Sequence, residues 1–175
     1  MEAHMEEPVI SVKEARETIR AHQAQTPVQM VKLAEALGAE VYKVAEWDES
    51  ISGMILRNKD ADKRDGKHYK IYVNANHSWE RRRFTIAHEI AHMVLHTNLI
   101  GDGLQDDGLY RSGLSNALEA QANNFAADIL MPWHLINEAM DNTPNASVGE
   151  LADIFEVSKS AMSIRLGVPF ETQAS

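Results

Sequence analysis

Residues 78–96 read SWERRRFTIAHEIAHMVLH, and they give the strongest structural signal in the sequence. Ser78 can cap the amino end of a helix. Glu80 suits the first turn, because a negative charge there meets the positive end of the helix dipole. The apolar residues that follow recur at helical spacing, as in a helix packed inside a core. We therefore expect a helix over roughly residues 79–96.

The same helix carries the motif His-Glu-x-x-His at positions 88–92. Residues four apart lie one turn apart on one face, so the imidazoles of His88 and His92 can converge on one metal ion. Glu89 is rotated about a quarter turn from His88, where it can reach a metal-bound water without being a ligand. The motif predicts a zinc site with Glu89 as the general base. The plain alternative is a pair of histidines on a partly buried helix face.

A catalytic zinc needs three protein ligands and one open position, so a third ligand must come from elsewhere. Residues 118–132, LEAQANNFAADILMP, predict most of a second helix over about 115–130. Glu119 is the only acidic residue in its first two turns, and a carboxylate beside an apolar stripe is costly to bury unless paired or metal-bound. We expect Glu119 to be the third ligand, and Asn123 to hydrogen-bond a ligand. The alternative for Glu119 is a solvated residue at the helix amino end.

Other candidates for the ligand set fit less well. His96 lies two turns from His88 on the same helix, which is poor geometry for a third ligand. His77 and His134 are expected to be surface or capping residues, and Asp128 to be solvated or paired. The oxyanion formed during peptide hydrolysis needs a further donor. The candidates for that donor lie in the loop between the two ligand helices, at Tyr110 and Arg111.

Composition limits the class of protein. A length of 175 residues with 44% hydrophobic residues suits one globular domain, residues 1–175. The lack of cysteine excludes disulfides and thiolate metal ligands. A net charge of −9 argues against direct binding of nucleic acid. The acidic start is no secretory signal and no run of about 18 apolar residues occurs, so we expect a cytoplasmic protein that does not bind membranes.

The remaining segments predict an α+β fold. Three strand-like segments, 39–45, 51–57 and 68–74, are expected to form a small antiparallel sheet packed on the metal helix. Residues 1–10 are expected to be a flexible tail, and 98–113 a glycine-rich loop beside the site. Further helices are expected at 11–22, 27–37, 133–140, 148–155 and 159–166. The helix over 27–37 is expected to begin at Pro27 and to bury Val31.

The chain resembles the ImmA/IrrE family of zinc metallo-endopeptidases. The segments that carry the resemblance are ERRRFTIAHEIAHMVLH (80–96) and LEAQANNFAADILMP (118–132), with a weaker match in VSKSAMSIRL (157–166). The family often has a second glutamate where this chain has Gln121, which leaves Glu119 as the carboxylate ligand. The resemblance implies a zincin-like, gluzincin-type domain with Zn²⁺ bound by His88, His92 and Glu119 and with Glu89 as general base. It also implies a specific protein substrate, a helix-turn-helix transcriptional repressor.

The C-terminal subregion, residues 141–167, supports two rival interpretations. Residues 147–166 themselves predict a helix-turn-helix-like unit, with a capping box at its first helix. A DNA-reading helix is basic, and from residue 141 onward only Lys159 and Arg165 are basic. We therefore expect this unit to pack or to dock a protein. The alternatives to an enzyme are a DNA-binding regulatory module and a non-catalytic, metal-bound interaction module.

Overall fold

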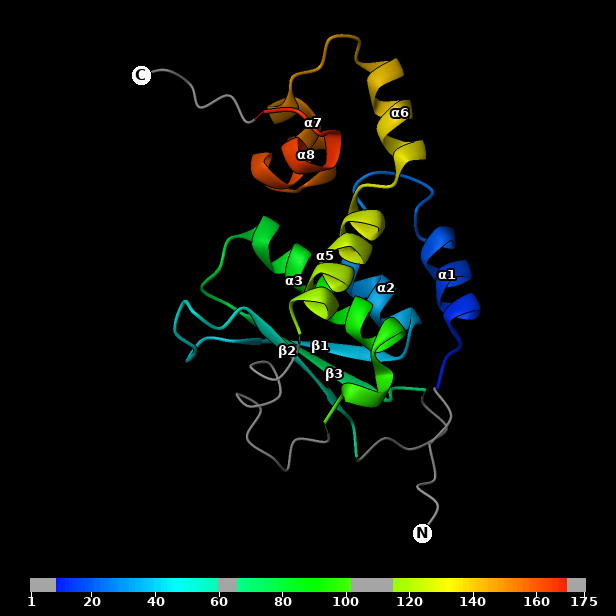
Figure 1. Ribbon diagram of the computed structural model, residues 1–175, viewed down its shortest axis with the longest axis vertical. Coiled ribbons are helices and arrows are strands. Elements are labelled where there is room, and N and C mark those ends of the chain that lie inside the picture. Colours follow the sequence, from blue (N-terminus) through cyan, green and yellow to red (C-terminus); the bar gives the residue numbers. More distant parts are fainter. Residues whose placement is uncertain (1–8, 60–65, 102–114, 170–175) are drawn as a thin grey trace.

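The computed structural model describes residues 9–59, 66–101 and 115–169, which form an α+β fold (Figure 1). The amino-terminal half contains α1 (Val12–Ala21), α2 (Met30–Ala36), β1 (Ala39–Val44), β2 (Gly53–Arg57) and β3 (Tyr69–Asn74). The second half contains α3 (Trp79–Leu95), the 3-10 turn η1 (Thr97–Leu99), α5 (Asn116–Leu130), α6 (Trp133–Asn142), α7 (Val148–Phe155) and α8 (Lys159–Leu166). In these three ranges, every helix is too short or too polar to cross a bilayer. Most of the expected tail, residues 1–8, lies outside them.

The three strands are those predicted, but the prediction of an antiparallel sheet is wrong. The strand order is β1-β3-β2, and β3 pairs antiparallel with β2 and parallel with β1. Ile71 in β3 lies opposite both Val41 and Ile55. Three alternate residues of β3, Tyr69, Ile71 and Val73, are buried, and both backbone edges of this central strand are paired. The chain therefore passes from β1 to β2 across the end of β3.

Helix α3 packs against the sheet through β2 and β3, with α2 and α5 beside it. The core lies between these layers and continues under α6 and α7. Each large apolar side chain buried there contributes roughly 1.5 to 3 kcal/mol. The largest fully buried apolar side chains include Leu33, Ile55, Ile71, Ile90, Met93, Ile129, Leu130, Ile136, Phe155 and Met162. Helix α3 is thus held on several sides, which makes it a rigid support for side chains that it projects.

The caps confirm the helix starts predicted at several serines. Ser78 accepts a hydrogen bond from the Arg81 amide, and Ser115 accepts one from the Leu118 amide. Ser147 and Glu150 form the capping box expected at the start of α7. These bonds satisfy amides that would otherwise lack partners in the first helical turn. Helices α3 and α5, which carry the candidate ligands, therefore begin where the sequence predicts.

Helix α2 differs from its prediction. It begins at Met30, after an extended Gln29, and not at Pro27. Met30, Leu33 and Ala34 are buried, whereas Val31 is 44% exposed. A stripe at spacings of three and four residues from Met30 passes through Leu33 and Ala34 and leaves Val31 about 100° off the buried face.

Candidate metal centre

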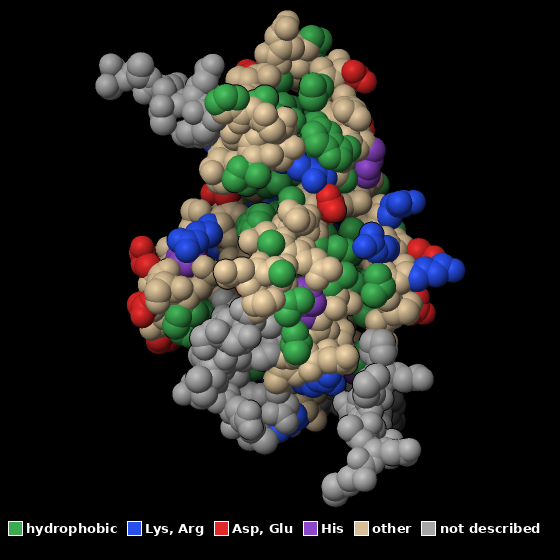
Figure 2. Space-filling model, in the orientation of Figure 1, with side chains coloured by type: hydrophobic (Ala, Val, Ile, Leu, Met, Phe, Trp, Pro, Cys, Tyr) green, Lys and Arg blue, Asp and Glu red, His purple; other side chains and the backbone are tan. Residues whose placement is uncertain are grey.

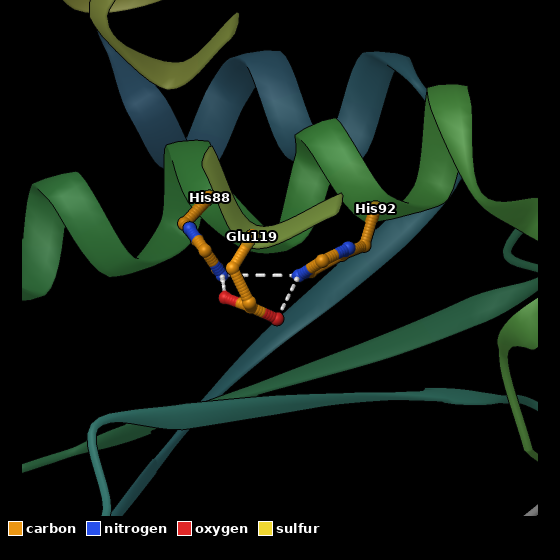
Figure 3. A group of neighbouring side chains, drawn as sticks. All are labelled: His88, His92 and Glu119. Carbon is orange, nitrogen blue, oxygen red and sulfur yellow. Dashed lines mark hydrogen bonds and ion pairs between the residues drawn. The ribbon is translucent and has the colours of Figure 1, made fainter. Parts of the chain in front are cut away.

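Three side chains from α3 and α5 converge on one point (Figure 3). His88 Nε2 and His92 Nε2 lie 3.0 Å apart. The Glu119 carboxylate reaches between them, with Oε2 at 3.1 Å from His88 Nε2 and Oε1 at 3.3 Å from His92 Nε2. Each residue thus directs one potential ligand atom inward, and these atoms lie within 4.8 Å of one another.

The geometry and chemistry of the three residues fit a zinc ion. Two imidazole nitrogens and one carboxylate are a common ligand set of catalytic zinc. Ligand bonds of about 2.0 to 2.1 Å in a tetrahedral site place neighbouring ligand atoms about 3.3 Å apart. The two imidazole nitrogens lie 3.0 Å apart, and each has a Glu119 carboxylate oxygen at 3.1 or 3.3 Å, which is close to that value. The roles of His88, His92 and Glu119 as ligands stay predictions that this arrangement supports.

Burial divides the cluster into a deep side and an open side. The His92 side chain is 4% exposed, that of His88 is 15% exposed, and that of Glu119 is 37% exposed. His92 lies in the middle of α3, whereas Glu119 lies in the first turn of α5. The cluster is therefore most exposed to solvent on the side of Glu119.

The outer ring nitrogens of both histidines contact other side chains. Asn123 Oδ1 lies 2.8 Å from His88 Nδ1, and its role behind a metal ligand stays a prediction that this contact supports. His92 Nδ1 lies 2.9 Å from His96 Nδ1. His96 is therefore outside the ligand cluster and behind it. An amide oxygen only accepts, so Asn123 Oδ1 receives the His88 Nδ1–H, and the Nε2 lone pair points at the cluster.

Glu89 is almost fully buried, with 1% exposure, and it faces strand β2. A β-carbon added to Gly53 would lie 3.4 Å from Glu89 Oε1 and only 2.3 Å from Thr85 Cγ2. Gly53 therefore allows α3 to approach β2 closely and keeps the Glu89 carboxylate beside the strand. Sequence reasoning missed Gly53, because its partners lie more than 30 residues away.

Burial, together with the neighbouring imidazole of His88, lowers the pKa of His92 from 6.5 to about 4. The carboxylate of Glu119 acts in the opposite direction and does not outweigh these effects. His92 is therefore neutral at pH 7. The neutral imidazole is the form that binds a metal, so protons compete with a metal at this residue only in acid.

The other residues that the sequence singled out have separate environments. His77 is 7% exposed with its Nε2 at 3.0 Å from the Glu49 carbonyl oxygen, so its assignment to the surface is wrong. It is buried where the turn after β3 lies against residues 48–51, and the Glu49 oxygen pairs with its Nε2, whereas its buried Nδ1 has no hydrogen-bond partner among the described residues. His134 is exposed, and Asp128 is paired with Arg165, both as expected. Tyr110 and Arg111 lie outside the described residues.

Comparison with known proteins assigns the chain to a protein family. Residues 34–167 match the family described as the IrrE N-terminal-like domain, Peptidase M78, and the chain belongs to this family. It is 37% identical over 103 residues to the radiation response metalloprotease IrrE of Deinococcus radiodurans, which covers 55% of this chain and 30% of that protein. It is 27% identical over 115 residues to the metallopeptidase ImmA of Bacillus subtilis, covering 66% of this chain and 62% of ImmA.

The chain spans less than two thirds of the length of these relatives. A solved structure, a Mycobacterium tuberculosis transcriptional regulator, matches with a TM-score of 0.56 at 18% identity. That match covers 91% of this chain and 48% of the regulator. It shows a shared fold, and the family assignment confirms the resemblance that the two helix motifs predict.

Proposed function

We propose that this chain is a zinc-dependent endopeptidase with a zincin-like, gluzincin-type site. The observation that carries the proposal is the convergence of His88, His92 and Glu119 beside a buried Glu89. The two named metallopeptidase relatives support it, because they belong to the same class of enzyme. The three converging residues hold Zn²⁺, and Glu89 remains free of the ligand set to handle protons.

A bound zinc ion would supply a Lewis acid that polarises the scissile carbonyl and makes a water molecule more acidic. Glu89 accepts the proton of that water on its carboxylate as the water oxygen attacks the carbonyl carbon. Glu89 then donates the proton to the amide nitrogen, which leaves as an amine when the C–N bond breaks. Packing against Gly53 holds the carboxylate in one orientation through both transfers.

Strand β2 offers a place for an extended peptide substrate. Within the part of the chain that the structure describes, β2 has a strand neighbour only on the side of β3. Bonds from Asn74 N to Ser52 O and from Asn58 N to His68 O fix which residues of β2 face β3. The alternate residues, Gly53 and Ile55, direct their backbone groups outward. A peptide added along this edge would pass Glu89.

The C-terminal subregion, residues 141–167, provides a surface for a folded protein substrate. A groove of about 790 Å³ lies between α3, α5 and α8. Hydrophobic side chains gather on the upper part of the face in Figure 2, over the C-terminal helices. Ile164 at the groove is 78% exposed, and Asn123, which contacts His88, lines the same groove. The groove therefore leads from the site to α8, and we propose that both belong to one metallopeptidase domain.

The substrate that we propose is a helix-turn-helix transcriptional repressor. The test incubates the zinc-loaded chain with the product of the neighbouring gene, with and without a chelator, and maps products by mass spectrometry. We expect cleavage at one or a few sites, no cleavage with the chelator, and little cleavage of casein. Glu89→Gln is the control for a contaminating protease. Rapid digestion of casein at many sites would contradict narrow specificity and leave the zinc mechanism standing.

A further inference from the structure

A third histidine, His96, lies at the end of helix α3 behind the candidate metal centre. His96 follows the last residue of α3 and is 6% exposed. Its Nδ1 lies 2.9 Å from His92 Nδ1, and its Nε2 lies 2.7 Å from Gln121 Oε1. Gln121, on α5, is therefore linked to the cluster by contacts through the rings of His96 and His92. His96 and Gln121 form a chain of contacts that ends on one of the candidate ligands.

The hydrogen bonds of this chain have one consistent direction. The oxygen of Gln121 only accepts, so His96 Nε2 donates to it. A neutral imidazole carries one N–H, so His96 Nδ1 is then the acceptor and His92 Nδ1–H donates to it. The His92 proton is thereby held on Nδ1. Its Nε2 keeps a lone pair, and Nε2 is the atom that faces His88 and Glu119.

We propose that His96 and Gln121 are positioning residues that hold His92 in the tautomer that can bind a metal through Nε2. The inference rests on the proposed metal centre and extends it beyond the ligands. His88 has the same arrangement in one step, because Asn123 accepts from its Nδ1 directly. His92 lies deeper in the molecule, so its partner is a second histidine, His96. The series of hydrogen bonds from His92 ends at Gln121, which is exposed.

The chemistry at position 121 decides the direction of the chain. An acceptor there gives the tautomer described above, whereas a donor would place the His96 proton on Nδ1 and the His92 proton on Nε2. A protonated Nε2 cannot bind a metal. Gln121→Glu keeps an acceptor, and Gln121→Leu removes it. Asn124→Leu is the matched control, because Asn124 is an exposed amide residue on the same helix.

The test measures zinc affinity by competition with a chromophoric chelator, for wild type and the three variants. We expect Gln121→Leu to bind zinc about 10-fold more weakly, since loss of a residue behind a ligand typically costs 10- to 100-fold. Gln121→Glu and Asn124→Leu should stay within about 3-fold of wild type. His96→Phe should lose at least as much as Gln121→Leu, and thermal unfolding of each metal-free variant checks that it is folded.

The second measurement is the ¹H–¹⁵N imidazole spectrum of the metal-free protein at pH 8. It reports which nitrogen of His92 carries the proton. Wild type and Gln121→Glu should show the proton on Nδ1, and Gln121→Leu should show a mixture. Unchanged affinity and an unchanged spectrum in Gln121→Leu would overturn the proposal, as would an equal loss in Asn124→Leu. Neither measurement uses a peptide substrate. If the variants respond as expected but the protein cleaves nothing, the proposed endopeptidase activity is rejected and the positioning role of His96 and Gln121 stands.

Discussion

Two helix pairs of this protein, α3 with α5 and α7 with α8, bury very different side chains. The pair α7 and α8 buries Leu151, Phe155 and Met162, and its only buried polar residue is Ser163. Helix α3 alone buries Arg83, Thr85, Glu89 and His92, and His96 at its end. Buried polar groups oppose folding unless they are paired. So many buried polar residues on one helix are expected where the helix contributes to a functional site. The residues of α7 and α8 are those expected of helices that pack in a core.

Arg83 is the exception among the buried polar residues of α3, because it joins the two regions. Its guanidinium donates to the carbonyl oxygens of Val28, Phe155 and Glu156. Burial lowers its pKa, with the nearby Glu156 opposing that effect. Arg83 therefore has a structural role. The contrast between the two pairs predicts that changes on α3 affect chemistry first, and changes on α7 affect stability first.

The largest expected effect is that of Glu89→Gln. An amide cannot accept the proton of the attacking water, so peptidase activity should fall by about 10² to 10⁴-fold. Zinc binding should remain, because Glu89 is outside the ligand cluster. The measurements are cleavage rate and zinc content on the same preparation, with exposed Glu138→Gln on α6 as the matched control. Near-normal cleavage by Glu89→Gln would remove Glu89 from the mechanism.

Phe155→Ala tests the other side of the comparison. Phe155 is fully buried at the end of α7, so its loss should lower the free energy of unfolding by about 3 to 5 kcal/mol. Denaturant unfolding of the metal-free protein measures this change. Ile164→Ala, at an exposed position on α8, should change it by less than about 0.5 kcal/mol. If Phe155→Ala stayed folded but lost zinc affinity, metal binding and stability could not be assigned to separate helix pairs.

Acid should weaken the metal-free protein through His92. Since its pKa falls from 6.5 to about 4 on folding, the unfolded chain binds more protons between these values. The contribution of His92 to the free energy of unfolding is complete above pH 6.5 and is lost as the pH falls toward 4. The loss at pH 4 is roughly 3 kcal/mol. The measurement compares unfolding free energies at pH 7 and pH 4 in wild type and His92→Asn. An equal loss in both proteins would mean that His92 does not contribute.

Much of the candidate site could be predicted because its signals are local. Two histidines four residues apart on a capped helix must share a face, whatever the rest of the chain does. A carboxylate beside the apolar stripe of the next helix points to Glu119, and Asn123 follows one turn later. The starts of α3, α5, α7 and α8 were predictable for the same reason, because each depends on a serine and the three residues after it.

The arrangements that join distant segments could not be predicted from the sequence and depend on tertiary packing. The alternation of residues in β3 suits an edge or a central strand, so it could not reveal that β3 lies between β1 and β2. The contact of Gly53 with Glu89, the burial of His77 and the chain from His92 through His96 to Gln121 each join residues from different elements or turns. Such contacts depend on how helices and strands pack, and a sequence pattern records only which face of each element is apolar.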